Sequence, residues 1–141
     1  MEHFRKLERM YHTAPINGWF QPVLRVGDGE AEIQLPLRPE FHHSAGATHG
    51  SLYFKAMDDA AFFAANSLVE DVFVLTATFE LAFLKPVVDG TLCAKARVSG
   101  EDTTRIYAEV DLLDSKNRLI GKGKGSFARS TIALSTVAEY R

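Results

Sequence analysis

The sequence contains a single cysteine, Cys93, and no long apolar run among its 141 residues. One cysteine cannot form a disulfide within the chain, and no Cys–His spacing typical of a zinc site occurs. We therefore expect a reducing, cytoplasmic setting and no bound metal. No segment approaches the ~18 uncharged apolar residues of a membrane-spanning helix. The charged first eleven residues also lack the apolar stretch of a signal peptide, so we expect no contact with a membrane.

An excess of charge of either sign is missing too. Sixteen lysines and arginines against eighteen acidic residues leave a formal net charge of −2. Because nucleic-acid-binding domains usually carry a strong basic excess, we expect no nucleic acid partner. Hydrophobic residues make up 46% of the chain and ten residues are phenylalanine, which excludes intrinsic disorder. The length suits a single domain, residues 1–141, that can bury a substantial core.

The hydrophobic periodicity predicts the order of the elements. It indicates a helix in the first dozen residues, strands at 23–26 and 31–37, a buried helix at 51–67, and strands at 72–84, 92–98, 106–112 and 119–127. We expect residues 1–18 to form an N-terminal helix and linker, with His3 on the surface, and residues 131–141 to form a loose tail. The predicted fold is α+β, with one central helix covered by a curved antiparallel sheet whose later strands form a meander. The free edges of such a sheet favour oligomerisation.

Two adjacent acids, Asp58 and Asp59, stand in the middle of a predicted helix that is apolar nearly all round. Lys55 lies four positions before Asp59 and can pair with it. Asp58 has no partner within the helix, and a carboxylate is costly to bury unpaired. Asp58 is therefore turned to solvent, satisfied by a distant arginine, or kept in a partly apolar pocket to act as a base or nucleophile.

A second candidate lies at the start of the same helix, where Gly50 follows His49. Backbone N–H groups in a first helical turn are unsatisfied and favour negative charge, so the Gly50 amide could polarise a carbonyl group. A glycine before a helix is by itself more often only structural. Eight residues separate Gly50 from Asp58, about 12 Å along a helix. If both groups act on one carbonyl, they come from two copies of the chain, which predicts a homodimer with two composite sites.

Three segments together resemble the hotdog-fold acyl-CoA thioesterases of the phenylacetyl-CoA (PaaI-type) family. The resemblance is carried by residues 42–67, 76–92 and 114–127, and it covers about residues 20–130. That family has a His-Gly pair at the start of its central helix, an acid nine positions after the His, and a strand that ends in an aromatic, a basic residue and Pro. His49-Gly50, Asp58 and Phe83-Leu84-Lys85-Pro86 match this pattern. The resemblance implies a hotdog fold, one long central helix wrapped by a curved antiparallel sheet.

The resemblance also implies a role for each matching residue. Asp58 would be the catalytic carboxylate, the Gly50 amide would polarise the thioester carbonyl, and His49 would line the site. His43 stands where the family commonly has Asn or Gln, and a histidine there could donate a hydrogen bond or titrate near neutral pH. Thr76 stands where relatives often have a Ser or Thr that helps to place the water.

The implied activity is hydrolysis of an acyl-CoA thioester by a dimer or a dimer of dimers. Coenzyme A is then part of the substrate, and no cofactor is expected. Lys85 and Arg105 are candidate contacts for its phosphates, although Arg105 equally suits a solvated strand edge.

Two other functions stay open, an acyl-thioester hydratase or dehydratase and a non-catalytic acyl-CoA-binding protein. The acyl group is open as well, because Phe54, Phe62 and Phe63 could line a pocket or belong to the core.

Overall fold

The computed structural model describes residues 1–141 and has the predicted order of strands and main helices, with an additional short helix, α2, where a linker was expected. The N-terminal half contains α1 (Glu2–His12), α2 (Asn17–Phe20), β1 (Val23–Gly27), β2 (Glu30–Pro36), the 3-10 turn η1 (Pro39–Phe41) and the central helix α3 (Gly50–Asn66). The C-terminal half contains β3 (Val72–Phe83), β4 (Thr91–Glu101), β5 (Arg105–Leu113), β6 (Leu119–Ala133) and the 3-10 turn η2 (Leu134–Thr136).

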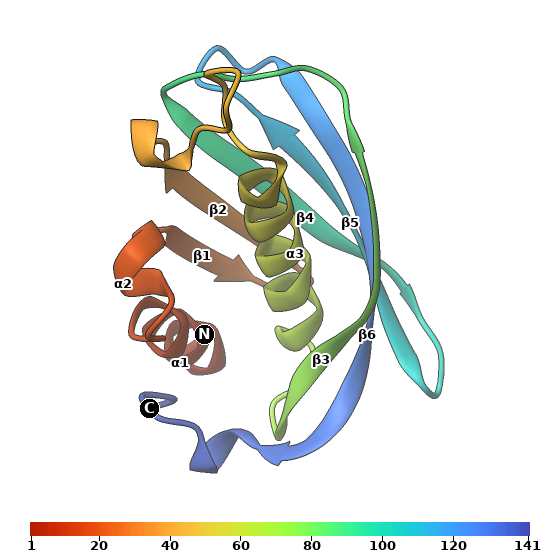
Figure 1. Ribbon diagram of the computed structural model, residues 1–141. Helices are drawn as coiled ribbons and strands as arrows, with labels where there is room; N and C mark the ends of the chain where they lie inside the picture. Colours follow the sequence, from red (N-terminus) through yellow and green to blue (C-terminus); the bar gives the residue numbers. More distant parts are fainter.

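The six strands form one antiparallel sheet in the order β1-β2-β4-β5-β6-β3, and this sheet curves around α3 (Figure 1). Alternate residues of β4 and β5 are buried, as the sequence pattern predicts for strands with one face on a core. Fully buried alanines, listed here, let the helix lie close to the sheet: Ala56, Ala60, Ala61, Ala64 and Ala65. The predicted hotdog fold is thereby confirmed.

The expected meander is correct only for β4, β5 and β6. β3 pairs with β6 and not with its sequence neighbour β4, so the chain leaves one edge of the sheet after β3 and re-enters it beside β2. Hydrophobic alternation determines which face of a strand is buried, but it does not choose the strand's neighbours. The prediction therefore failed at the step that depends on pairing between distant segments.

The two edges of the sheet differ. At the β1 edge, the Val26 N–H donates to the Glu8 carboxylate at 2.8 Å and the Leu24 N–H donates to His12 Nε2 at 3.0 Å, so side chains of α1 occupy backbone groups of that strand. At the opposite edge, the twelve residues of β3 pair with β6 on one side only. An uncovered edge of this length is a template for pairing with another chain.

The two ends of the chain lie together, which corrects the expectation of a loose tail (Figure 1). β6 continues to Ala133, Leu134 is buried, and the Tyr140 hydroxyl lies 2.6 Å from His3 Nδ1. The other ring nitrogen of His3 lies 2.9 Å from the Asn66 carbonyl oxygen. His3, which we expected on the surface, is therefore buried, because a segment almost the whole chain length away covers it.

Glycines on β6 make room for an aromatic ring of β3. A Cβ atom at Gly123 would stand 2.9 Å from two ring carbons of Phe79, closer than side chains approach one another. The Phe79 ring in turn meets Phe54 of α3 edge-on, with centroids 5.6 Å apart. The absence of a side chain at Gly123 thus lets β3 contact the central helix.

We predict that Gly123→Ala lowers the free energy of unfolding by about 1–3 kcal/mol, because the added methyl group overpacks the Phe79 ring. Chemical denaturation measures the change. Gly100→Ala is the matched control, since a Cβ atom there meets nothing within 4 Å. Adding Phe79→Ala to Gly123→Ala should make the glycine substitution nearly neutral; an unchanged cost in that background would contradict the packing explanation.

Candidate functional site

Asp58 lies in the wall of a cavity of about 510 Å³. The cavity is bounded by α3, by β3, by residues 10–17 and by residues 137–139 near the C-terminus. Four of its lining side chains carry aromatic rings: Tyr11, Phe62, Phe63 and Phe73. Of the phenylalanines left open by the sequence, Phe62 and Phe63 line this cavity, whereas Phe54 is 42% exposed beside Phe79.

No arginine pairs with the Asp58 carboxylate, which instead contacts Thr76 of β3 and faces a partly apolar cavity, the third of the alternatives that the sequence left open. The Thr76 hydroxyl donates to Asp58 Oδ1 at 3.0 Å. Burial raises the pKa of Asp58 to about 6; the negative charge of Asp59 adds to this rise, while the Thr76 hydrogen bond and Lys55 oppose it. A carboxyl group with this pKa is ionised at neutral pH and can take up a proton there.

The neighbouring Asp59 is fully engaged in other interactions. Its carboxylate pairs with Lys55 at 2.7 Å, as predicted, and accepts a hydrogen bond from the Tyr11 hydroxyl at 2.7 Å. Lys55 also donates to the Asn17 side chain at 2.8 Å. Sequence reasoning missed Tyr11 and Asn17, because nothing in the local pattern shows that the N-terminal segment folds against α3. The two adjacent acids therefore have different environments, and only Asp58 lacks a cation within pairing distance.

The Gly50 amide lies in a second hollow of about 340 Å³, at the N-terminal end of α3. The Gly50 N–H has no hydrogen-bond acceptor within the chain. A Cβ atom at this position would stand 3.0 Å from the Phe83 ring, so glycine lets that ring pack against the start of the helix. His43 and Lys85 line the same hollow. His49 caps the helix, since its Nδ1 accepts the Ser51 N–H at 3.0 Å.

Within one chain, the predicted site residues thus fall into two groups. Asp58 and Thr76 share the aromatic cavity, while Gly50, His43 and Lys85 share the hollow at the helix start. The two groups are about 12 Å apart along α3, because Gly50 and Asp58 are eight helical residues apart.

Arg105 and Lys85 are not brought together within the chain. Arg105 pairs with Ala128 of β6, whereas the Lys85 N–H donates to the carbonyl group of Ile120. These β6 positions are eight residues apart, about 26 Å along a strand. Lys85 and Arg105 of one chain therefore cannot hold the same phosphate group.

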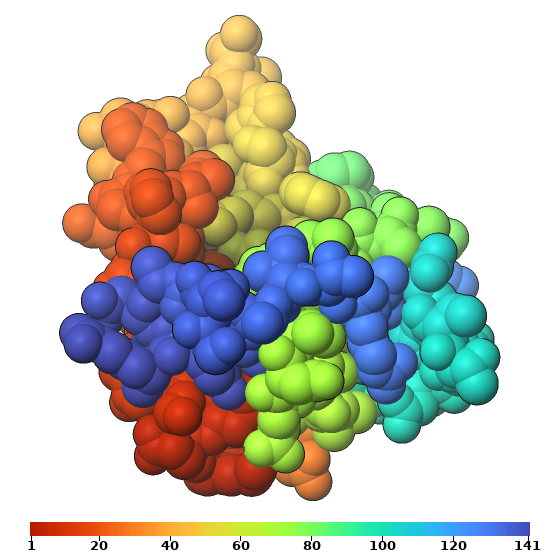
Figure 2. All heavy atoms as spheres, turned by 90° about the horizontal axis from the view of Figure 1, so that it is seen from below, coloured from red at the N-terminus to blue at the C-terminus, as the bar shows by residue number.

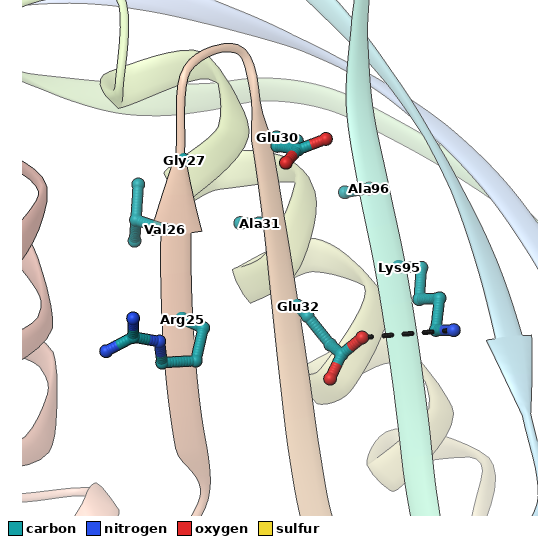
Figure 3. Close-up of a pocket in the computed structure, with 8 residues that line it drawn as sticks. All are labelled: Arg25, Val26, Gly27, Glu30, Ala31, Glu32, Lys95 and Ala96. Carbon is teal, nitrogen blue, oxygen red and sulfur yellow. Dashed lines mark ion pairs between the residues drawn. The ribbon is translucent and has the colours of Figure 1, made fainter.

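Another hollow lies on β1, β2 and β4, at the edge of the sheet opposite β3 (Figure 3). Its charged side chains are of both signs, and Glu32 and Lys95 form an ion pair at 3.9 Å. It contains neither an unpaired buried acid nor a helix terminus.

No group of three or more His, Cys, Asp or Glu side chains is arranged to hold a metal ion. No helix is long and apolar enough to cross a membrane.

The structure is that of a hotdog-fold protein whose central helix carries a partly buried acid and a free N-terminal amide. The family model described as "Thioesterase superfamily" matches residues 45–120, more than half of the chain. The chain belongs to the thioesterase superfamily. The match includes the whole of α3 and β3, which carry Gly50, Asp58 and Thr76.

Individual relatives agree with this assignment. The structure is similar to that of the Escherichia coli PaaI protein from the phenylacetic acid degradation operon, with a TM-score of 0.84 at 16% identity over 94% of this chain and 96% of that one. It is also similar to the conserved protein PA5202 of Pseudomonas aeruginosa, with a TM-score of 0.79 at 26% identity over 86% and 98%. By sequence, 126 residues are 24% identical to "Putative esterase SSO2140" of Saccharolobus solfataricus, covering 89% of this chain and 86% of that one. The structural likenesses show the fold, while the family model and the esterase name of the curated relative support hydrolysis of a thioester.

We predict that Thr76→Val raises the pKa of Asp58 further, because the hydrogen bond from Thr76 stabilises the carboxylate and not the protonated acid. NMR titration of the Asp58 carboxyl carbon measures the shift without any assumption about activity. Thr76→Ser, which keeps the hydroxyl, should retain the original value. A pKa that stays near 6 in Thr76→Val would show that the Thr76 hydrogen bond does not control this group.

Proposed function

We propose that the chain hydrolyses an acyl-CoA thioester to a carboxylic acid and coenzyme A, at composite sites of a homodimer. In each site the Gly50 amide of one copy polarises the carbonyl group, and Asp58 of the other copy is the general base or nucleophile. The observation that carries the proposal is the partly buried Asp58, bound to Thr76, without a paired cation and beside an apolar cavity. Such a group is costly to maintain unless it has a chemical role.

Contacts between α3 and β3 indicate where the two-fold axis of this dimer would pass. The residue midway between Gly50 and Asp58 on α3 is Phe54. Phe83 lies against Gly50 and Thr76 binds Asp58, and the midpoint between these two β3 residues falls between Phe79 and Glu80. The Phe54 and Phe79 rings are in contact. A two-fold axis that passes beside this ring pair would place Gly50 opposite Asp58 of the second copy and would join the two β3 edges.

Apolar side chains are exposed around this axis, beside polar residues of β3 such as Glu80. Large hydrophobic residues of α3, β3 and the following loop are exposed there: Phe54 42%, Leu75 46%, Phe83 60% and Leu84 48%. Together with the uncovered β3 edge, they favour association through this face over the β1 edge, which α1 covers.

The chemistry follows from this arrangement. The Gly50 N–H would donate to the thioester oxygen and stabilise negative charge on it in the transition state. Asp58 would either take a proton from the attacking water or attack the carbonyl carbon itself, giving an anhydride that water then hydrolyses. In both routes the C–S bond breaks, and the thiolate of coenzyme A takes up a proton. Thr76 would hold the carboxylate, while His43 and His49 would line the approach to the Gly50 amide.

The same symmetry gives the phosphates a composite contact. Across the two-fold axis, Lys85 of one copy would lie at the same height along β3 as Val74 of the other copy. Within one chain, Arg105 and Leu75 both pair with the same residue of β6, so Arg105 lies at the height of Leu75. Lys85 from one copy and Arg105 from the other would therefore lie toward the same end of the site. We propose these two cations as contacts for the phosphates of coenzyme A.

We predict that Asp58→Asn lowers kcat/KM by at least about a hundredfold, because the amide can neither accept the proton nor attack. The variant should remain a folded dimer of equal or greater stability, since a neutral amide is cheaper to bury than a carboxylate. In the unmodified protein the rate should fall below about pH 6, as Asp58 becomes protonated. Thiol release from a panel of acyl-CoA substrates measures these effects. Full activity of Asp58→Asn would contradict the proposal.

The role of the Gly50 amide has a matched pair of variants. Gly50→Ala adds a methyl group but keeps the N–H, whereas Gly50→Pro adds a similar bulk and removes it at a helical position that tolerates proline. We expect Gly50→Pro to have a kcat lower than that of Gly50→Ala by about 10²–10³. Equal activities would show that the amide does not act on the substrate.

Co-expressed Asp58→Asn and Gly50→Pro chains test the composite site. A mixed dimer would contain one site with both defects and one intact site, so activity should return to about half per mixed dimer. Sites built within one chain would stay inactive.

The two alternative functions give different results in the assays. A change in enoyl absorbance without thiol release would indicate a hydratase or dehydratase, and saturable binding without turnover would indicate a binding protein.

A further inference from the structure

The cavity beside Asp58 is closed largely by the two ends of the chain. Residues 10–17 form one of its walls and residues 137–139 another, in addition to α3 and β3. Figure 2 shows the C-terminal segment lying across the molecule between the N-terminal residues and β3. Neither wall belongs to the sheet-and-helix unit that carries Gly50, Asp58 and Thr76.

Specific contacts hold both walls in place. The N-terminal wall is tied to α3 by the Tyr11–Asp59 hydrogen bond and by Lys55, which bridges Asp59 and Asn17. Burial and the negative charge of Asp59 raise the pKa of Tyr11 well above its usual range, so its hydroxyl remains a donor. The C-terminal wall is anchored by Leu134, which is buried, and by the hydrogen bond between Tyr140 and His3. The walls are therefore ordered parts of the fold.

The cavity leads from Asp58 towards these walls in steps. Asp58 and Thr76 meet at one level of α3 and β3. One helical turn further, Phe62 meets Phe73, with ring centroids 5.1 Å apart. Beyond Phe73, Val72 pairs with Ala133, and the turn η2 then leads from Ala133 to the C-terminal wall. A group whose reacting carbon lies at Asp58 and whose tail extends along this cavity would thus pass the aromatic rings and end at the chain termini.

We propose that this cavity binds the acyl group of the thioester and that the two chain ends set the length of acyl chain it accepts, with Ala14 and Val137 as specificity-determining residues. The proposal rests on the proposed function, because it takes Asp58 as the reacting end. The lining rings and aliphatic side chains suit an uncharged apolar acyl group. Ala14 and Val137 line the cavity from opposite ends of the sequence, so each wall can be changed separately.

The test uses the full-length protein and two 2-oxoalkyl-CoA thioethers, in which a methylene group between carbonyl and sulfur blocks hydrolysis. One carries a three-carbon and the other a ten-carbon acyl chain, and calorimetry gives their dissociation constants. Val137→Phe and Ala14→Leu should each weaken binding of the long analogue at least tenfold and change that of the short one less than twofold. Ser135→Phe is the control, since Ser135 is exposed on the same C-terminal segment and does not line the cavity.

Several results would overturn the proposal: no binding of the long analogue by the unmodified protein, an unchanged ratio of the two dissociation constants in both variants, or the same change in Ser135→Phe. If one variant does not fold, the variant of the other wall decides. Because binding is measured without turnover, the outcome is separate from that of the proposed function. Chain-length-dependent binding with no hydrolysis of any thioester would support the acyl cavity and refute the hydrolase.

Discussion

The central helix keeps its two candidate catalytic groups at a fixed separation. The free Gly50 amide and the Asp58 carboxylate are eight residues apart on α3, and a helix packed on alanines against a sheet neither bends nor shortens. A single carbonyl group cannot reach both within one chain. The proposed dimer follows from this distance. The two edges of the sheet agree with it, because α1 side chains occupy the β1 edge and leave the β3 edge as the uncovered one.

Successive side chains of a helix point in different directions, and this separates two acids that are neighbours in the sequence. Asp59 points towards the N-terminal segment, where Lys55 and Tyr11 satisfy it, and it helps to tie that segment to the helix. Asp58 points towards β3, where it finds one hydroxyl group and an aromatic cavity. The high pKa of Asp58 is therefore a product of its surroundings, while a similar carboxyl group one position away is paired with a cation.

Predictions from the sequence were accurate wherever the information was local. Alternation and helical spacing located every strand and the central helix, and the i, i+4 rule identified the Lys55–Asp59 pair. The missing partner of Asp58 within its own helix also marked that residue as exceptional. Errors arose where segments far apart in the chain meet: β3 beside β6, the buried His3, and the C-terminal segment that packs instead of remaining loose.

The sequence by itself determined the elements, their buried faces, the position of the unpaired acid and its distance from the helix start, because each depends on spacing within one segment. Only the tertiary structure decided which strand edge stays open, that Thr76 binds Asp58, and that residues 10–17 and 137–139 enclose the cavity. The physical reason is the same in each case. Contacts between distant segments are chosen by the packing of the whole chain, and local periodicity carries no record of that choice.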